Sequence, residues 1–376
     1  MRSSVVSGLS RPVSLLRAVA LGAFFIAGAM GSAQAAGCGT AVSPGYHQLT
    51  MRSGGMDREA VLFVPASYSG KTKVPVVFDL HGSNSYPRAQ IARSRWDDVA
   101  EREGFLLVAP QGGLDGKVEG THAWNVPGVT PGGGPDEEAF LKDVVETVKD
   151  RFCVDPGRIY ASGYSGGGRM LSQYICNGYA DFASAGFVMS LRAGYPFEKD
   201  GIWQPESQSC HPAAPVSIIA FWGSKDNINP FAGGGGPYWQ YSGETALRRW
   251  AELNGCEGDM KLTEGERISS AEFDRCKGGV RILSYMIKDG SHSWPGRSVG
   301  FAIGSNSGKA AREVDVAGRM WSFFSDGDAQ LVSDRQTDDR CTMKAVTAMS
   351  EAGSQATICD QNGETASKKE LAAGAL

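Results

Sequence analysis

The sequence predicts an α/β fold with a mainly parallel β-sheet and helices on both faces. Short apolar runs rich in β-branched residues alternate with amphipathic segments between residues 74 and 324. This alternation is typical of parallel sheets, because each helix returns the chain to the same edge of the sheet. The 376 residues are 41% hydrophobic and 21% charged, as in an ordinary globular chain, which excludes wholesale disorder.

Two kinds of strand are predicted. Residues 58–64 (REAVLFV) alternate polar and apolar side chains, as an exposed edge strand does. Residues 74–80 (VPVVFDL) and 105–109 (FLLVA) are continuous apolar runs, which indicates strands buried on both faces. Apolar runs predict the later strands at residues 158–163, 183–190, 215–222 and 280–286.

Helices are predicted between these strands. Residues 89–103 carry apolar side chains at helical spacing. Residues 135–152 begin with three acids, which the helix dipole stabilises in a first turn. Further helices are predicted at residues 167–177, 243–253 and 309–324. Residues 191–214 lack periodicity and are the candidate lid, and the glycine-rich run 232–236 is expected to be a mobile or tightly wound loop.

The two ends of the chain are expected to lie outside the principal domain, residues 37–325. Residues 1–36 contain three arginines, no acid and an apolar run too short to span a bilayer comfortably. Ala33-Gln34-Ala35 then forms a small-x-small cleavage site, so the segment is interpreted as a secretory signal peptide. Residues 326–376 are polar and are expected to be a tail. We therefore expect a periplasmic or secreted protein.

The cysteines support export. All eight follow the predicted signal: Cys38, Cys153, Cys176, Cys210, Cys256, Cys276, Cys341 and Cys359. An even number in an exported chain predicts four disulfides, with Cys256–Cys276 and Cys341–Cys359 suggested by short spacing and the other pairs left open. The alternative of a lipid on Cys38 would leave an odd number. The net charge of −4 without a basic stripe disfavours nucleic acid and anionic membranes as partners.

The pentapeptide Gly163-Tyr164-Ser165-Gly166-Gly167 matches G-x-S-x-G. It lies between a predicted strand and a predicted helix, which is the context of a nucleophile elbow, a strained turn that exposes a serine above the sheet. Ser165 is therefore the candidate nucleophile, and the Gly166 N–H can face an oxyanion. His81-Gly82-Ser83 follows another buried strand, and the Ser83 N–H is the candidate second oxyanion donor.

A serine nucleophile needs a base, and His292 is the candidate because it follows the last predicted strand. Asp226 follows the strand before it and is the candidate orienting acid. The order Ser165, Asp226, His292 is that of α/β-hydrolases. Asp259 and Asp289 are the rival acids. Of the other histidines, His47, His81 and His211 are assigned structural or surface positions, and His122 is either a loop residue or part of the cleft wall. Neither a metal-binding cluster nor a phosphate-binding loop is recognised in the sequence.

Four segments together resemble the secreted polyhydroxybutyrate depolymerase and feruloyl esterase-like family: Leu80-His81-Gly82, residues 163–170, Trp222-Gly223-Ser224-Lys225-Asp226 and His292-Ser293-Trp294-Pro295-Gly296. The resemblance covers residues 38–325 and implies an α/β-hydrolase fold, a Ser-His-Asp triad and no cofactor. Trp222 departs from it, because many members have histidine there. Within the family, the whole chain looks most like the bacterial oxidised polyvinyl alcohol hydrolases, which cleave C–C bonds of β-diketones. The alternatives are a feruloyl esterase, a polyhydroxyalkanoate depolymerase and, remotely, an inactive binding module.

A polymeric or oligomeric substrate requires an open groove, which aromatic side chains commonly wall. Tyr164, Trp222 and Trp294 are each within a few residues of a candidate catalytic side chain and are the expected substrate contacts. Tyr238 and Trp239, beyond the glycine run, are candidates for an outer wall. The alternative for each ring is packing beneath the loops.

Overall fold

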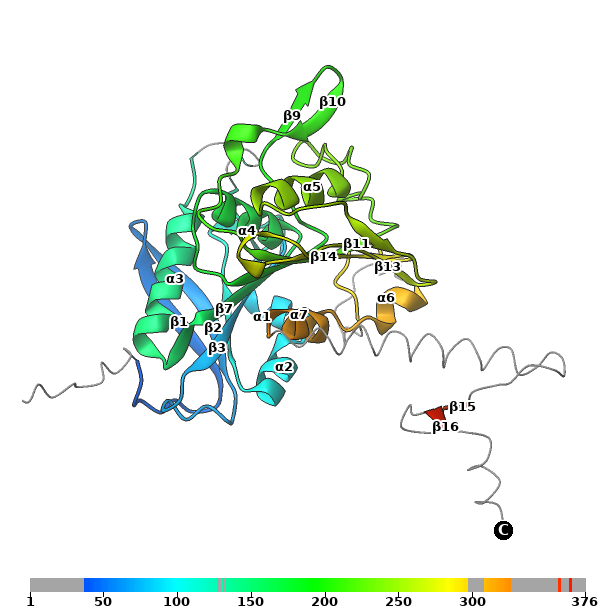
Figure 1. Cartoon of the computed structure of the whole chain (residues 1–376). Coiled ribbons are helices and arrows are strands. Elements are labelled where there is room, and N and C mark those ends of the chain that lie inside the picture. Colours follow the sequence, from blue (N-terminus) through cyan, green and yellow to red (C-terminus); the bar gives the residue numbers. More distant parts are fainter. Residues whose placement is uncertain are drawn as a thin grey trace, which may run out of the picture. The chain divides into compact units, whose positions relative to one another are not determined.

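The computed structural model describes residues 37–126, 130, 133–296 and 308–325, together with two short strands, β15 (Ile358–Cys359) and β16 (Thr365–Ala366). Within these residues the principal sheet has ten strands, in the order β1-β2-β4-β3-β7-β8-β11-β14-β13-β12 (Figure 1). Their bounds, in sheet order, are β1 (Gly45–Ser53), β2 (Met56–Val64), β4 (Leu106–Pro110), β3 (Val74–Leu80), β7 (Val154–Tyr164), β8 (Ser184–Val188), β11 (Ser217–Gly223), β14 (Ile282–Ile287), β13 (Ile268–Phe273) and β12 (Lys261–Thr263).

The strands from β4 to β14 pair in parallel, and antiparallel strands extend the sheet on either side. The central parallel strands are buried along nearly their whole length, which explains their continuous apolar sequences. Because their carboxyl ends meet at one edge, the loops that follow them can bring distant residues together. The predicted α/β-hydrolase fold is confirmed.

Helices cover both faces of this sheet (Figure 1). They are α1 (Pro87–Ser94), α2 (Trp96–Glu103), α3 (Glu137–Arg151), α4 (Gly166–Cys176), α5 (Gly243–Leu253), α6 (Lys309–Glu313) and α7 (Val316–Phe324). One core contains Phe140 of α3, Met170 of α4 and Trp250 of α5. The other core contains Trp96 of α2 and Met320 of α7, on the opposite face. Alternate residues of each buried strand therefore contact different cores.

Three sequence predictions are corrected. The strand at 58–64 is not an edge, because β1 pairs with its free side. The helix expected at 89–103 is two helices, because Arg95 adopts a left-handed conformation with φ 60° and ends α1. The helix expected at 309–324 is also two, since Asp315 caps the start of α7 by accepting a hydrogen bond from the Gly318 N–H. The edge strand β12 and its neighbour β13 were not predicted.

Three disulfides occur in the described part of the chain. Cys256–Cys276 is confirmed, and Cys38–Cys153 and Cys176–Cys210 are the other two. Because the Cys38 sulfur is bonded to Cys153, the lipidated alternative is wrong for this structure. The expected pair Cys341–Cys359, the signal peptide 1–36 and the tail 326–376 lie outside the described residues, apart from strands β15 and β16.

The candidate lid, residues 191–214, contains a β-hairpin. Strands β9 (Pro196–Lys199) and β10 (Ile202–Pro205) pair antiparallel, and Cys210 bonds to the end of α4. The hairpin extends beyond α5 in Figure 1, with Trp203 exposed. The glycine-rich loop is tightly wound: Gly233 N–H donates to Pro230 O and Gly235 N–H to Trp239 O. In the part of the chain that the structure describes, we find no helix long and apolar enough to cross a membrane.

Candidate active site

Ser165 lies in the turn that joins β7 to α4. Its backbone has φ 48° and ψ −113°, a conformation that non-glycine residues rarely adopt, and its N–H donates to Val188 O. Such strain is expected of a nucleophile elbow. Ser165 follows the carboxyl end of β7 and is 8% exposed.

Two glycines permit this turn because strand and helix approach closely. A Cβ atom on Gly163 would lie 2.5 Å from the Gly168 Cα, and a Cβ on Gly167 would lie 2.3 Å from Leu80 O. Both distances are too short for nonbonded atoms, so a side chain at either position would displace its neighbour. The small residues of the sequence motif are therefore required by packing of the elbow against its own helix and against β3.

The acid and base loops leave neighbouring strands, β11 and β14. Gly223, at the end of β11, approaches so closely that a Cβ there would lie 2.4 Å from Gly290 O. Lys225 N–H donates to the same carbonyl, at 2.8 Å. These contacts hold the loops that carry Asp226 and His292 side by side.

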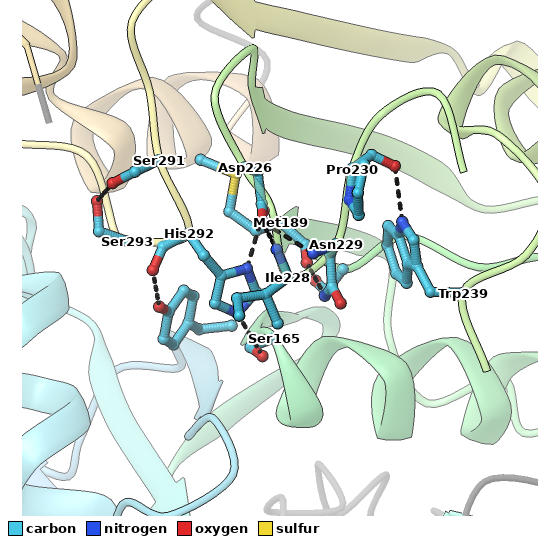
Figure 2. Close-up of polar contacts among 12 residues, drawn as sticks. Ser165, Met189, Asp226, Ile228, Asn229, Pro230, Trp239, Ser291, His292 and Ser293 are labelled. Atoms are coloured by element: carbon cyan, nitrogen blue, oxygen red, sulfur yellow. Dashed lines mark hydrogen bonds and ion pairs between the residues drawn. The ribbon is translucent and has the colours of Figure 1, made fainter. Parts of the chain in front are cut away.

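The structure brings Ser165, His292 and Asp226 into one hydrogen-bonded chain (Figure 2). His292 Nε2 lies 2.9 Å from Ser165 Oγ, and His292 Nδ1 lies 2.8 Å from Asp226 Oδ2. The other carboxylate oxygen, Asp226 Oδ1, accepts from the Ile228 and Asn229 N–H groups. The Asp226 side chain is 1% exposed and that of His292 15%, so the acid is enclosed while the base remains accessible.

The rival acids lie elsewhere. Asp289 accepts a hydrogen bond from the Ala311 N–H, 2.9 Å away, and Asp259 is exposed after α5. One ring nitrogen of His292 faces Ser165 Oγ and the other faces Asp226 Oδ2. Asp226 is therefore the acid that is hydrogen-bonded to this histidine.

The two candidate oxyanion donors lie against one another. A Cβ placed on Gly166 would come within 2.9 Å of the Ser83 nitrogen and 2.4 Å of its Oγ. Among the described residues, neither the Ser83 N–H nor the Gly166 N–H donates to another group. Two free amides beside Ser165 Oγ form a pair of donors suited to a negatively charged oxygen.

His81 fixes the turn that carries Ser83. It is fully buried, its Nδ1–H donates to Gly82 O, and its Nε2 accepts from the Gly112 N–H. One neutral tautomer satisfies both contacts, and burial lowers the pKa of His81 to about 4. His81 thus acts through the backbone, as its position in the sequence suggested. His122 forms a two-residue bridge with Ser85 in the same region.

A buried carboxylate, Asp79, was not recognised from the sequence. It lies on β3 and accepts hydrogen bonds from Gln90, Ser94 and Ser162. Burial raises the pKa of Asp79 to about 6. An acid inside the apolar run 74–80 was the available indication, since a charge buried in a strand requires partners. These partners connect β3 to α1 and β7, the elements beside the elbow.

The predicted aromatic groove is not formed by the tryptophans named for it. Trp222 is 1% exposed, and its Nε1–H donates to Ser284 Oγ, so it packs beneath the loops rather than facing a substrate. Trp294 and Trp239 are also buried, at 4% and 0%. Tyr164 contacts the base loop, because its hydroxyl donates to His292 O at 3.0 Å. Of the five rings, Tyr164 and Tyr238 are partly exposed.

Two histidines lie outside this arrangement: His47 is bonded to Ser43 O, and His211 is exposed beside Cys210. Within residues 37–126, 133–296 and 308–325, no three His, Cys, Asp or Glu side chains form a group that could hold a metal ion.

The fold and this arrangement define an α/β-hydrolase with a Ser-His-Asp constellation. The chain is 29% identical over 253 residues to feruloyl esterase B of Piromyces equi, a match that covers 63% of this chain and 42% of that protein. It is 24% identical over 325 residues to feruloyl esterase C of Emericella nidulans, covering 82% and 99%. A match to the bifunctional acetylxylan esterase/xylanase XynS20E of Neocallimastix patriciarum covers only 18% of that protein.

The chain thus spans less than half of the first relative. Among solved structures, an acetyl xylan esterase from Aspergillus awamori is 13% identical with a TM-score of 0.46, covering 66% of this chain and 94% of that one. The structure titled sOPH is 15% identical with the same TM-score, covering 70% and 86%. No protein-family model matches the chain.

Proposed function

We propose that this protein is a carboxylic ester hydrolase that uses Ser165 as its nucleophile. The observation that carries the proposal is the continuous hydrogen-bonded chain from Ser165 Oγ through His292 to the enclosed carboxylate of Asp226. A serine hydroxyl becomes nucleophilic when an adjacent base takes its proton, and the base must be oriented by a third group. The similarity to feruloyl esterases supports ester hydrolysis rather than another acyl transfer.

Each residue has a defined role in this reaction. Ser165 Oγ attacks the ester carbonyl while His292 Nε2 accepts its proton, and Asp226 stabilises the imidazolium that results. The N–H groups of Ser83 and Gly166 donate to the oxyanion of the tetrahedral intermediate. His292 then protonates the departing alcohol, and it next activates the water that hydrolyses the acyl-enzyme.

The ester is proposed to be of the feruloyl type, an aromatic acid joined to a sugar of a polysaccharide. The named activities of the relatives support this substrate class. A direct test is the release of ferulic acid from a feruloylated sugar by the purified protein, with Ser165→Ala as the control. Activity in the wild type and its loss in the variant are expected. Equal release by both proteins would contradict the proposal.

A β-diketone of oxidised polyvinyl alcohol is the second candidate substrate, supported by the resemblance in the sequence. Attack of Ser165 on one carbonyl expels a carbanion that the second carbonyl stabilises as an enolate. His292, 2.9 Å from Ser165 Oγ, is positioned to protonate that carbon, and water then releases the carboxylic acid. Parallel incubation with a β-diketone polymer, a feruloylated sugar and polyhydroxybutyrate distinguishes the candidates. A protein inactive on all three and on p-nitrophenyl acetate would be a binding module.

An exported location is part of the proposal. The three disulfides of the described chain support folding in an oxidising compartment, either the periplasm or the exterior. Separating cell fractions and assaying each for the protein tests this.

A further inference from the structure

A small cavity beside α4 contains two buried arginines and no acidic partner. Its volume is about 20 Å³, enough for one small group, and its walls include Arg169, Gln173 and Arg192. Arg169 is 8% exposed, Gln173 5% and Arg192 5%. No aspartate or glutamate is among the residues that line the cavity in the described structure.

Three N–H bearing atoms of the two arginines are buried without a hydrogen-bond partner in the described protein. They are Arg169 Nε, Arg169 Nη1 and Arg192 Nη2. The rest of the Arg192 guanidinium is satisfied, because Nε donates to Leu191 O and Nη1 to Tyr241 O. An unpartnered buried N–H destabilises a folded protein, so donors gathered at one cavity indicate an absent acceptor.

Aromatic rings hold both guanidinium groups in place. The Arg169 Cζ lies 4.2 Å from the centroid of the Tyr238 ring, and the Arg192 Cζ lies 3.5 Å from that of Trp239. Stacking of this kind stabilises the faces of the two cations and leaves their N–H edges to bind a ligand. Burial lowers the pKa of Arg169, and burial together with the nearby Arg169 lowers the pKa of Arg192 to about 10. The Arg192 side chain therefore remains cationic at neutral pH.

We propose that this cavity binds a carboxylate group. Its available groups are N–H donors beside two positive charges, and a carboxylate is a small acceptor-only anion that pairs with arginine through both oxygens. The pairing would offset the cost of two buried, uncompensated charges. Neither arginine takes part in the proposed hydrolysis, so the cavity is a site separate from Ser165, His292 and Asp226.

The position of Arg169 suggests where the carboxylate comes from. Its N–H donates to Ser165 O at 3.1 Å, so it stands one helical turn, about 6 Å, from the nucleophile. A carboxylate in the cavity and a carbonyl at Ser165 could then belong to one molecule, such as a dicarboxylic half-ester or an oligomer whose acidic end an earlier hydrolysis produced. This source rests on the proposed ester hydrolysis. A free small carboxylate is the other source.

Binding is tested without catalysis. In a Ser165→Ala background, thermal unfolding is followed at increasing sodium acetate, with sodium chloride at equal ionic strength as the reference. Acetate is expected to raise Tm in proportion to the logarithm of its concentration, and Arg169→Met is expected to remove the effect. Methionine has a similar length and removes an unpaired buried charge, so folding is preserved. Arg192→Met serves as the second variant, and Arg248→Met, on the exposed side of α5, is the matched control that retains the shift.

The source of the carboxylate is tested by steady-state kinetics in the protein that retains Ser165. In the first series the carboxylate is on the acyl part: p-nitrophenyl half-esters of succinate, glutarate and adipate are compared with neutral p-nitrophenyl esters of equal length. In the second series it is on the alcohol part: O-acetyl hydroxy acids are compared with O-acetyl alcohols. A substrate carboxylate predicts a preference in kcat/KM of roughly ten- to a hundredfold for one acidic series, the value of a charge-assisted hydrogen bond. In Arg169→Met the ratio of kcat/KM for the acidic ester to kcat/KM for its neutral counterpart should fall to about one.

The outcomes separate the two proposals. A preference for acidic esters supports a substrate carboxylate, and an acetate shift without that preference supports a free one. The cavity proposal is overturned if acetate shifts Tm no more than chloride does and no acidic ester is preferred. An acetate shift in a protein that hydrolyses no ester would leave the cavity proposal in place and contradict the proposed function.

Discussion

The hydroxyl of Tyr164 donates a hydrogen bond to the backbone carbonyl of His292, at 3.0 Å. The residue before the nucleophile thereby holds the loop that carries the base. Burial raises the pKa of Tyr164 to about 12, so the hydroxyl remains a donor throughout the working pH range. We therefore propose a positioning role for Tyr164, and the substrate contact expected from its place beside Ser165 stays a prediction.

Tyr164→Phe removes this single hydrogen bond and keeps the ring. We expect kcat to fall roughly fivefold, the value of a bond of about 1 kcal/mol, with KM and Tm little changed. Steady-state kinetics on p-nitrophenyl acetate measures this. Tyr46→Phe, which removes an exposed hydroxyl bonded to Asp97, is the control. A rise in KM at constant kcat would return Tyr164 to the substrate site.

Ser165→Ala and His292→Ala should each lower kcat by roughly 10⁴- to 10⁶-fold, because the two residues act as a unit. Asp226→Asn should cost about 10⁴-fold by losing the imidazolium partner and the correct tautomer. Circular dichroism and Tm should remain near wild type. Asp259→Asn, an exposed rival acid, is the matched control, and an inactive Asp259→Asn with an active Asp226→Asn would reverse the assignment.

Gly166→Ala should lower kcat by 10²- to 10³-fold, the typical value of one oxyanion donor. The added methyl group would meet the Ser83 Oγ and nitrogen, so the two amides must separate. Kinetics with an acetyl ester gives the loss. Gly157→Ala, where a Cβ would make ordinary contact at 3.5 Å, should be neutral. Activity of Gly166→Ala near wild type would remove these amides from the mechanism.

Asp79 and His81 should make opposite contributions to stability between pH 4 and 6. Asp79 has a raised pKa, about 6 against 3.8, so the folded state binds more protons in this window and stability falls as pH rises. His81 has a lowered pKa, about 4 against 6.5, so the unfolded state binds more protons and stability rises with pH. The two slopes offset one another.

Asp79→Asn removes the contribution of Asp79 to the pH dependence of stability. Asparagine can keep the bonds from Gln90 and Ser162 while donating to the Ser94 hydroxyl. The free energy of unfolding of the variant, minus that of wild type, should therefore increase from pH 4 to pH 6 and stay constant above. Urea unfolding at several pH values measures the difference. A difference independent of pH would contradict the raised pKa of Asp79.

Trp222→Phe should destabilise the protein by about 1–3 kcal/mol, since it removes a buried hydrogen bond to Ser284 and leaves space in the core. Hydrolysis of a feruloyl ester and of an acetyl ester should change by the same factor. Trp203→Phe, on the exposed strand β10, is the control and should leave Tm unchanged. A selective loss on the larger ester would restore Trp222 to the substrate site.

The candidate nucleophile, acid and base could be predicted because each follows a recognisable strand in a known order. Where side chains near them point is not set by spacing along the chain. Phe221 and Trp222 are neighbours on β11, yet they enter opposite cores because strand side chains alternate between faces. Proximity of Trp222 to Asp226 in sequence thus gave no information about exposure.

Other features depended on contacts distant in sequence. The left-handed Arg95, which divides one predicted helix into two, is not a glycine and carries no local indication. The unpartnered N–H groups of Arg169 and Arg192 become evident only when α4 and the loop after β8 are packed together. Long-range packing therefore decided what local patterns left open.

The disulfides described above join each cysteine to the next one along the chain: Cys38 to Cys153, Cys176 to Cys210 and Cys256 to Cys276. A chain crossing a membrane from its amino terminus presents its thiols to an oxidant in this same order. Oxidation of each new pair as it emerges would yield these native bonds directly, because none encloses or interleaves another. Maturation of this part of the chain should accordingly require a thiol oxidant but no disulfide isomerase.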